Sequence, residues 1–169
     1  QNGFQASNST GTISGNTITG IGYTGPAADS ASGMILFGNT NLFVTGNTIT
    51  SSTSLANSLG YGINFQILGS ATTVSNLTKA TISGNTVTNF PSAAGIMVQG
   101  GNATSPAAPA GVYGAGAASP IAITSNAVSG QSAGNRIGTQ GLIAGVGGRG
   151  SGFFVIAGNS VSNTSEIAL

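Results

Sequence analysis

The sequence predicts an all-β solenoid of about five coils, and three observations support that prediction. A short phrase with Gly-Asn or Ser-Asn between β-branched residues recurs along the chain, and its asparagines lie 31, 38, 41 and 33 residues apart, at positions 16, 47, 85, 126 and 159. A second segment, a glycine followed by alternating apolar residues, recurs between these phrases. Hydrophobic residues make up 39% of the chain, which is enough to form a core. Repeats of this length are typical of solenoids.

The first expected element of each coil is a short strand that follows the recurring glycine. These strands start at Gly3, Gly33, Gly62, Gly95 and Gly141. Successive side chains of a strand point to opposite faces, so alternate residues are expected to face the interior. The expected inward set is Phe4, Met34, Leu36, Ile63, Phe65, Ile67, Ile96, Val98, Leu142 and Ala144.

The second and third expected elements are short strands on either side of the asparagine. The same alternation puts one apolar residue of each strand inside, and these residues are Ile13, Ile18, Val44, Ile49, Ile82, Val87, Ile123, Val128, Ile156 and Val161. A single coil could not bury such residues alone. Stacked coils bury them in one continuous column, which is why solenoids need several repeats to be stable.

The recurring asparagine is expected to mark a tight bend, because asparagine tolerates the left-handed backbone region. Its amide both donates and accepts hydrogen bonds. Identical amides in neighbouring coils, about 4.8 Å apart, can therefore bond side chain to side chain along the stack. The predicted ladder consists of Asn16, Asn47, Asn85, Asn126 and Asn159.

With these phrases and this ladder, the chain resembles the right-handed parallel β-helix proteins of the pectate-lyase-like superfamily. The resemblance implies a single-stranded, right-handed parallel β-helix with an internal asparagine ladder between the second and third strands. One domain would span residues 1–169, with long loops between some coils and a loop excursion from Ala103 to Pro120. The superfamily includes lyases, hydrolases, epimerases, phage tailspikes and adhesins, so the resemblance implies a fold without a function.

Enzymes of that superfamily place ionisable side chains, often with Ca²⁺, on the outside of the first strand. General acid-base catalysis needs such groups, and hard Ca²⁺ needs several oxygen ligands together. The two carboxylates, Asp29 and Glu166, are expected about 20 Å apart at strand spacing. We therefore expect a non-catalytic chain with no metal and no cofactor. The outward positions hold no ionisable residue: Gln5, Ile35, Phe37, Asn64, Gln66, Met97, Gln99 and Ile143.

The charge content limits the classes of partner. Charged residues make up 3% of the chain and the net charge is +1, so a nucleic-acid partner is not expected. No apolar run is long enough for a membrane span. Net charge near zero favours self-association. Pairs such as Thr48 and Thr50 could form an ice-binding array, but the fourth and fifth coils interrupt it.

Two surfaces are candidates for contacts. The outward apolar side chains of the first strand are expected on one sheet face, where they mark either a contact with another molecule or the surface beneath the Ala103–Pro120 loop. This candidate contact face consists of Ile35, Phe37, Met97 and Ile143. The candidate stacking ends are Gly3, Phe4 and Gln5 at one end and Ile167 and Leu169 at the other.

The sequence shows no capping helix at either end, so the outermost strand edges are expected to be bare. Either the chain is a window of a longer β-helix, or its ends stack on neighbouring copies. We expect a secreted structural subunit that stacks head to tail into an extracellular filament or surface layer. The alternative is a segment of a cell-surface adhesin or a phage tailspike that binds a glycan or another protein.

Overall fold

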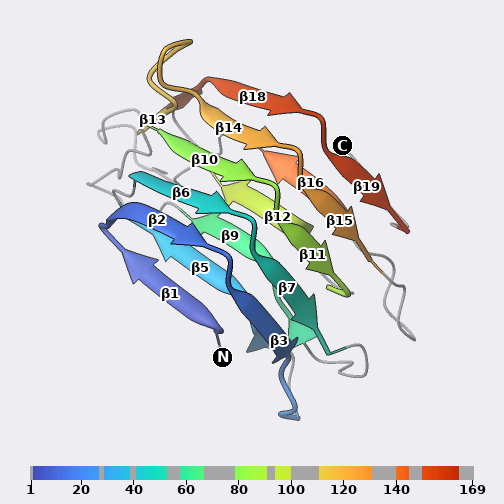
Figure 1. Cartoon of the computed structure of the whole chain (residues 1–169). Helices are drawn as coiled ribbons and strands as arrows, with labels where there is room; N and C mark the ends of the chain where they lie inside the picture. Colours follow the sequence, from blue (N-terminus) through green and yellow to red (C-terminus); the bar gives the residue numbers. More distant parts are fainter. Residues whose placement is uncertain are drawn as a thin grey trace.

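The computed structural model describes residues 2–26, 29–38, 41–52, 58–66, 79–90, 94–99, 111–130, 140–144 and 150–163. The regular structure in these ranges is all β, and its paired strands run parallel (Figure 1). None of the described segments forms a helix that is long and apolar enough to cross a membrane. The prediction of an all-β, parallel architecture is confirmed.

Most of the described strands belong to three stacked five-stranded sheets, which we call A, B and C. Sheet A contains β1 (Phe4–Ser7), β5 (Met34–Phe37), β9 (Ile63–Gln66), β12 (Ala94–Gln99) and β16 (Gln140–Ala144). Sheet B contains β2 (Thr10–Ser14), β6 (Asn41–Thr45), β10 (Ala80–Ser83), β14 (Ile121–Thr124) and β18 (Phe154–Ala157). Sheet C contains β3 (Thr17–Ile21), β7 (Thr48–Ser51), β11 (Thr86–Thr88), β15 (Ala127–Ser129) and β19 (Ser160–Ser162).

The chain visits sheets A, B and C in turn and then returns to A, so strands from successive repeats lie side by side. We call one strand from each sheet, taken from the same repeat, a rung. The first rung is β1, β2 and β3, and the last described rung is β16, β18 and β19. The arrangement is compatible with a parallel β-helix.

Two smaller pairs of strands lie in the connections between strands of the three sheets. Strand β4 (Asp29–Ser30) pairs with β8 (Ser58–Leu59), and β13 (Gly111–Tyr113) pairs with β17 (Gly150–Gly152). Strand β13 belongs to the segment Ala103–Pro120, for which the sequence predicts a loop. Where the structure describes this segment, at residues 111–120, it therefore includes a paired strand as well as turns.

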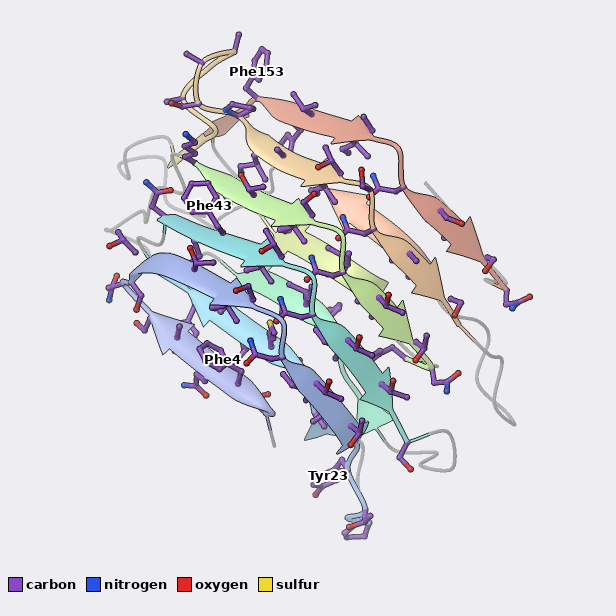
Figure 2. All side chains as sticks on the ribbon, viewed as in Figure 1. Phe4, Tyr23, Phe43 and Phe153 are labelled. Atoms are coloured by element: carbon purple, nitrogen blue, oxygen red, sulfur yellow. The ribbon has the colours of Figure 1, made fainter. Side chains whose placement is uncertain are left out.

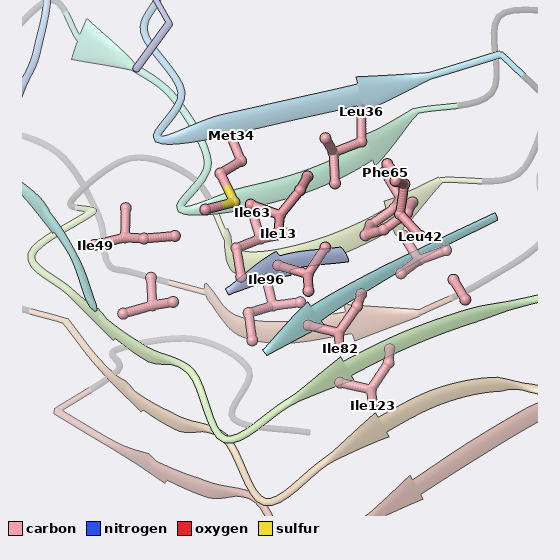
Figure 3. Close-up of a cluster of buried hydrophobic side chains, with 14 of the residues drawn as sticks. Ile13, Met34, Leu36, Leu42, Ile49, Ile63, Phe65, Ile82, Ile96 and Ile123 are labelled. Atoms are coloured by element: carbon pink, nitrogen blue, oxygen red, sulfur yellow. The ribbon is translucent and has the colours of Figure 1, made fainter. Parts of the chain in front are cut away.

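The core is a column of apolar, mostly aliphatic side chains between the three sheets (Figure 3). Rows of like residues follow the strand register; one row on sheet B joins Ile13, Val44, Ile82, Ile123 and Ile156. The predicted interior is confirmed for its central members, which are buried: Met34, Leu36, Val44, Ile49, Ile63, Phe65, Ile82, Val87, Ile96, Val98, Ile123 and Val128.

The prediction that every inward residue is buried is wrong at the two outermost rungs. Ile156 is 45% exposed and Phe4 is 38% exposed, although both belong to inward rows. Within the described residues, each of these rungs has a neighbouring rung on one side only. Ile67 and the side chains of Leu142 and Ala144 fall outside the described part of the chain.

The sharp bend between sheets B and C depends on the residue before each ladder asparagine. Gly15, Gly46, Gly84 and Gly158 have φ angles of 63–66°, and Ser125 takes the equivalent place with φ 56°. The prediction that the asparagine itself takes the left-handed conformation is wrong. Glycine adopts that conformation at little cost, and the asparagine beside it extends its amide along the stack.

Ser125→Gly is expected to stabilise the fold by about 1 kcal/mol, because a side chain in the left-handed region costs about 1–2 kcal/mol and glycine's extra freedom in the unfolded chain offsets part of the gain. Chemical denaturation followed by circular dichroism measures the change. The reverse substitution at the equivalent bend, Gly84→Ser, is the matched control and is expected to destabilise. Equal stabilities of all three proteins would contradict the assignment of backbone strain to Ser125.

Candidate functional site

The ladder asparagines form a continuous chain of side-chain hydrogen bonds through the stack. The Nδ2 group of each donates to the Oδ1 atom of the next, at 2.9 Å in all four steps. The backbone N–H of each donates to the same Oδ1 atom at 3.0 Å. The ladder joins Asn16, Asn47, Asn85, Asn126 and Asn159 in chain order.

The central amides have a partner for every hydrogen-bonding group. Asn85 is fully buried, and its Oδ1 accepts from both the backbone and the side chain of Asn47. Its Nδ2 donates forward to Asn126 Oδ1 and back to the carbonyl oxygen of Val44 at 2.8 Å. Buried amides are stable only when satisfied in this way, so the ladder fixes the register of neighbouring rungs.

The ladder has a direction, because every side-chain bond along it is donated toward the higher-numbered rung. At the first rung, Asn16 is exposed and its Oδ1 accepts no hydrogen bond from any described residue. At the last described rung, Asn159 Nδ2 donates only to the carbonyl oxygen of Ile123, which leaves one of its hydrogens and its backbone N–H without an acceptor in the described part. Within the described residues, the ladder therefore ends in an unpaired acceptor at the first rung and in unpaired donors at the last.

The edge strands of the sheets have open sides as well. Among the described residues, β1, β2 and β3 have no strand beyond them on one side, and β16, β18 and β19 have none on the other (Figure 1). Exposed apolar residues accompany these edges, with Phe4 on the first rung and Ile156 on the last. We call β1–β3 the leading edge and β16, β18 and β19 the trailing edge.

The structure describes part of the predicted stacking ends. Gly3, Phe4 and Gln5 lie on the leading edge, where Gly3 N–H donates to Ser32 O and Phe4 N–H donates to Gly33 O. Figure 2 labels Phe4 on this edge. The other two predicted residues, Ile167 and Leu169, lie outside the described residues.

The candidate contact face lies along the outside of sheet A. One outward row joins Gln5, Ile35, Asn64, Met97 and Ile143 in register. Ile35, Met97 and the neighbouring Phe37 are half-buried, and the side chain of Ile143 is not described. Asn64, at the centre of the row, is only 3% exposed, and its Oδ1 is buried without a hydrogen-bond partner. The sequence places Asn64 at an outward position and does not indicate this burial.

Few ionisable residues lie in the described part of the chain. The described residues contain no cluster of three or more His, Cys, Asp or Glu residues that could hold a metal ion. Asp29 lies in β4, and the amino group of Lys79 lies 5.9 Å from the ring centre of Phe43. Glu166, Arg136 and Arg149 fall outside the described ranges.

Sheet C presents hydroxyl groups on its outer face. Thr17, Thr48 and Thr86 are exposed and paired in register, and Ala127 and Ser160 continue the row. In the next row, Thr88 donates a hydrogen bond to Thr50 at 3.0 Å. A register shift in β3 after Ile18 interrupts this second row at the first rung. The threonine array is therefore short and irregular.

Comparison of the chain with protein-family models, with curated proteins and with solved structures found no match in any of the three.

Proposed function

We propose that this chain is a non-catalytic structural subunit that stacks end to end, leading edge on trailing edge, into an extracellular filament or surface layer. Its fold in this proposal is a single-stranded, right-handed parallel β-helix of about five coils, related to the pectate-lyase-like superfamily. The observation that supports the proposal most directly is the complementary ladder, in which, among the described residues, Asn16 has a free acceptor and Asn159 has free donors.

Three kinds of contact would form when a trailing edge meets a leading edge. The strand edges gain backbone hydrogen bonds, as in other cases of strand addition. Asn159 of one copy donates to Asn16 of the next. Ile156, which is 45% exposed, becomes as buried as Ile123 in the same row. The near absence of charge, with 3% charged residues, means that little electrostatic repulsion opposes the contact.

The experiment that tests assembly is a comparison of Ile156→Lys with Val155→Lys. Both residues are exposed neighbours on β18, at 45% and 39%, but Ile156 belongs to the inward row and Val155 to the outward one. Lysine at 156 would bury an unpaired charge between copies, at a cost of about 3 kcal/mol or more. The concentration at which assembly begins is therefore expected to rise at least about a hundredfold.

Light scattering and electron microscopy of the purified proteins give the readout. Wild type and Val155→Lys are expected to form filaments or layers at the same concentration, and Ile156→Lys is expected to remain monomeric at that concentration. Its melting temperature is expected to equal that of wild type measured below the assembly concentration, because assembly itself stabilises the folded state. Wild-type protein that stays monomeric at millimolar concentration would refute the proposal.

One observation favours a second candidate, a glycan-binding segment of an adhesin or a tailspike-like protein. Phe43 is exposed on the outside of sheet B, flanked in register by Thr12 and Thr81 (Figure 2). An aromatic ring beside hydroxyl groups is a suitable platform for a sugar. Monomeric protein that binds immobilised glycans would favour this candidate over the filament.

A further inference from the structure

We propose that the two edges meet in one register, in which Phe154 of one copy lies over Gly11 of the next. This inference rests on the proposed end-to-end assembly and specifies its partner surface: the trailing edge of one copy binds the leading edge of a second copy of the same chain.

The first step is the size pattern of an inward row on sheet B. The register pairs Gly11 with Leu42 and joins Ala80, Ile121 and Phe154, and the pairing of Phe43 with Thr81 places Leu42 beside Ala80. Within this row the small Ala80 lies between the buried side chains of Leu42 and Ile121, and the row ends in two large residues, Ile121 and Phe154. Continuing the row into a second copy puts Gly11 between Phe154 and Leu42, so a small residue again lies between two large ones, as Ala80 does within the chain.

The second step is the space available at the two positions. A Cβ atom built on Gly11 meets no other heavy atom within 4 Å, so the leading edge is open at this point. Phe154 is half-buried and packs against the core from the trailing edge. A second copy in this register would cover the rest of its ring, and close packing of this kind is what fixes a unique arrangement of apolar surfaces.

The third step is that the same register pairs the free hydrogen-bonding groups at the two ends of the ladder. When Phe154 lies opposite Gly11, Ala157 lies opposite Ser14, and Asn159 therefore meets Asn16, two residues further along each chain. The free donors of Asn159 then approach the free Oδ1 of Asn16. Within the molecule, the corresponding step from Asn126 to Asn159 has the same donors and acceptor, at 3.0 and 2.9 Å.

The direction of the ladder also limits the symmetry of the assembly. Two leading edges brought together would place one Asn16 Oδ1 against another, and neither side chain would find the donor it lacks. The contact is therefore heterologous, and a heterologous contact that does not close into a ring produces a filament. The geometry points to a polar filament in which all copies face the same way.

Engineered disulfides test the register, since the chain contains no cysteine. In the proposed contact, Val155 of one copy lies beside Thr12 of the next, and both are exposed outward residues. Neighbouring strands are about 4.8 Å apart, within the span of a disulfide. After mild oxidation, Thr12→Cys/Val155→Cys is expected to give a series of covalent multimers of increasing size on a non-reducing gel.

The matched control is Ser14→Cys/Val155→Cys, which moves one cysteine two residues along β2 to another exposed position. The Cα atoms would then be about 8 Å apart, too far for a disulfide. Less than about a tenth of this control is expected to cross-link. Stronger cross-linking of this control than of Thr12→Cys/Val155→Cys would overturn the register. Disulfide-linked dimers of the single variant Val155→Cys would overturn the polarity, because they would join two trailing edges.

The role of Phe154 is tested by comparing Phe154→Ala with Phe153→Ala in the Thr12→Cys/Val155→Cys background. Phe153 is the adjacent aromatic residue, 41% exposed, and it is outside the inward row (Figure 2). Phe154→Ala is expected to raise the concentration needed for cross-linking about tenfold, and Phe153→Ala to leave it unchanged. If both substitutions raise the concentration needed for cross-linking equally, Phe154 is not part of the contact.

The two proposals fail in different ways. If wild type forms filaments that Ile156→Lys abolishes, but Thr12→Cys/Val155→Cys does not cross-link, the register is wrong and the end-to-end function stands. If neither wild type nor the cysteine variants assemble at any concentration, both proposals are refuted.

Discussion

Asn85→Leu is expected to lower the free energy of unfolding by about 2–6 kcal/mol. This is a large part of the total free energy of unfolding of an ordinary domain, which is about 5–15 kcal/mol. The substitution removes an acceptor from Asn47, whose backbone N–H and Nδ2 both donate to Asn85 Oδ1. Asn47 is buried, so water does not replace the lost acceptor. Each buried donor left without a partner costs about 1–3 kcal/mol. Urea denaturation followed by circular dichroism measures the loss.

Asn16→Leu is the matched control, because it removes the same amide from an exposed end of the same ladder. Asn47 Oδ1 loses one donor, the Asn16 side chain, but keeps the backbone N–H of residue 16 at 3.0 Å. The cost is expected to be about 1 kcal/mol or less. If Asn85→Leu and Asn16→Leu lower the free energy of unfolding equally, burial does not increase the contribution of a ladder asparagine to stability.

Asn85→Asp separates the accepting and donating functions of the amide. The carboxylate oxygens of this variant would still accept from Asn47, but they cannot donate to Val44 O or to Asn126 Oδ1, which Asn85 Nδ2 contacts at 2.8 and 2.9 Å. A buried charge facing two acceptor oxygens is costly. Asn85→Asp is therefore expected to be at least as destabilising as Asn85→Leu at neutral pH, in the same urea denaturation experiment.

The core rows and the ladder could be predicted from the sequence because stacking repeats one environment at each position. Each rung places a β-branched or aliphatic residue beside its equivalent, as in Val44, Ile82 and Ile123. The spacing between asparagines was enough to align the repeats without knowledge of the loops between them. Any feature that recurs once in each rung is visible in this way.

Features that occur once in the chain could not be predicted in the same way. Asn64 belongs to an outward row, yet it is buried with an unpaired Oδ1. Its neighbours in register, Ile35 and Met97, differ from it in chemistry, so no repeated pattern indicates its surroundings. The direction of the ladder was also missed, because a row of identical letters does not show which amide donates.

The sequence does contain a signal for the bend, in the residue before the ladder asparagine. Glycine precedes the ladder asparagine at residues 15, 46, 84 and 158, and each of these glycines has a positive φ. The one exception, Ser125, adopts the same conformation with φ 56°. The shared glycine was therefore the better indicator of the left-handed position than the asparagine beside it.

Gly62→Ala is expected to destabilise the chain by about 3 kcal/mol or more, at the upper end of the cost of overpacking a core. Gly62 directly precedes β9, and a Cβ atom there would clash with Val87 Cγ1 and with the carbonyl oxygen of Gly95. Gly33, its equivalent one rung earlier, meets Ile49 and the Gly62 carbonyl in the same way. The recurring glycine is thus explained by contact between sheets A and C and between rungs. Thermal and urea denaturation measure the change.

Two further variants separate a clash with backbone from a clash with a side chain. Gly46→Ala is the control for backbone strain alone, since its Cβ would meet nothing within 4 Å although φ is 63°, and it is expected to cost about 1–2 kcal/mol. Adding Val87→Ala to Gly62→Ala removes the nearest side-chain atom but leaves the Gly95 carbonyl, so stability is not expected to recover. Two results would contradict this explanation: recovery of stability in the double variant, or a Gly62→Ala protein as stable as Gly46→Ala. Either result would mean that neighbouring rungs can move apart at this glycine. The close spacing of the rungs would then not explain why glycine recurs there.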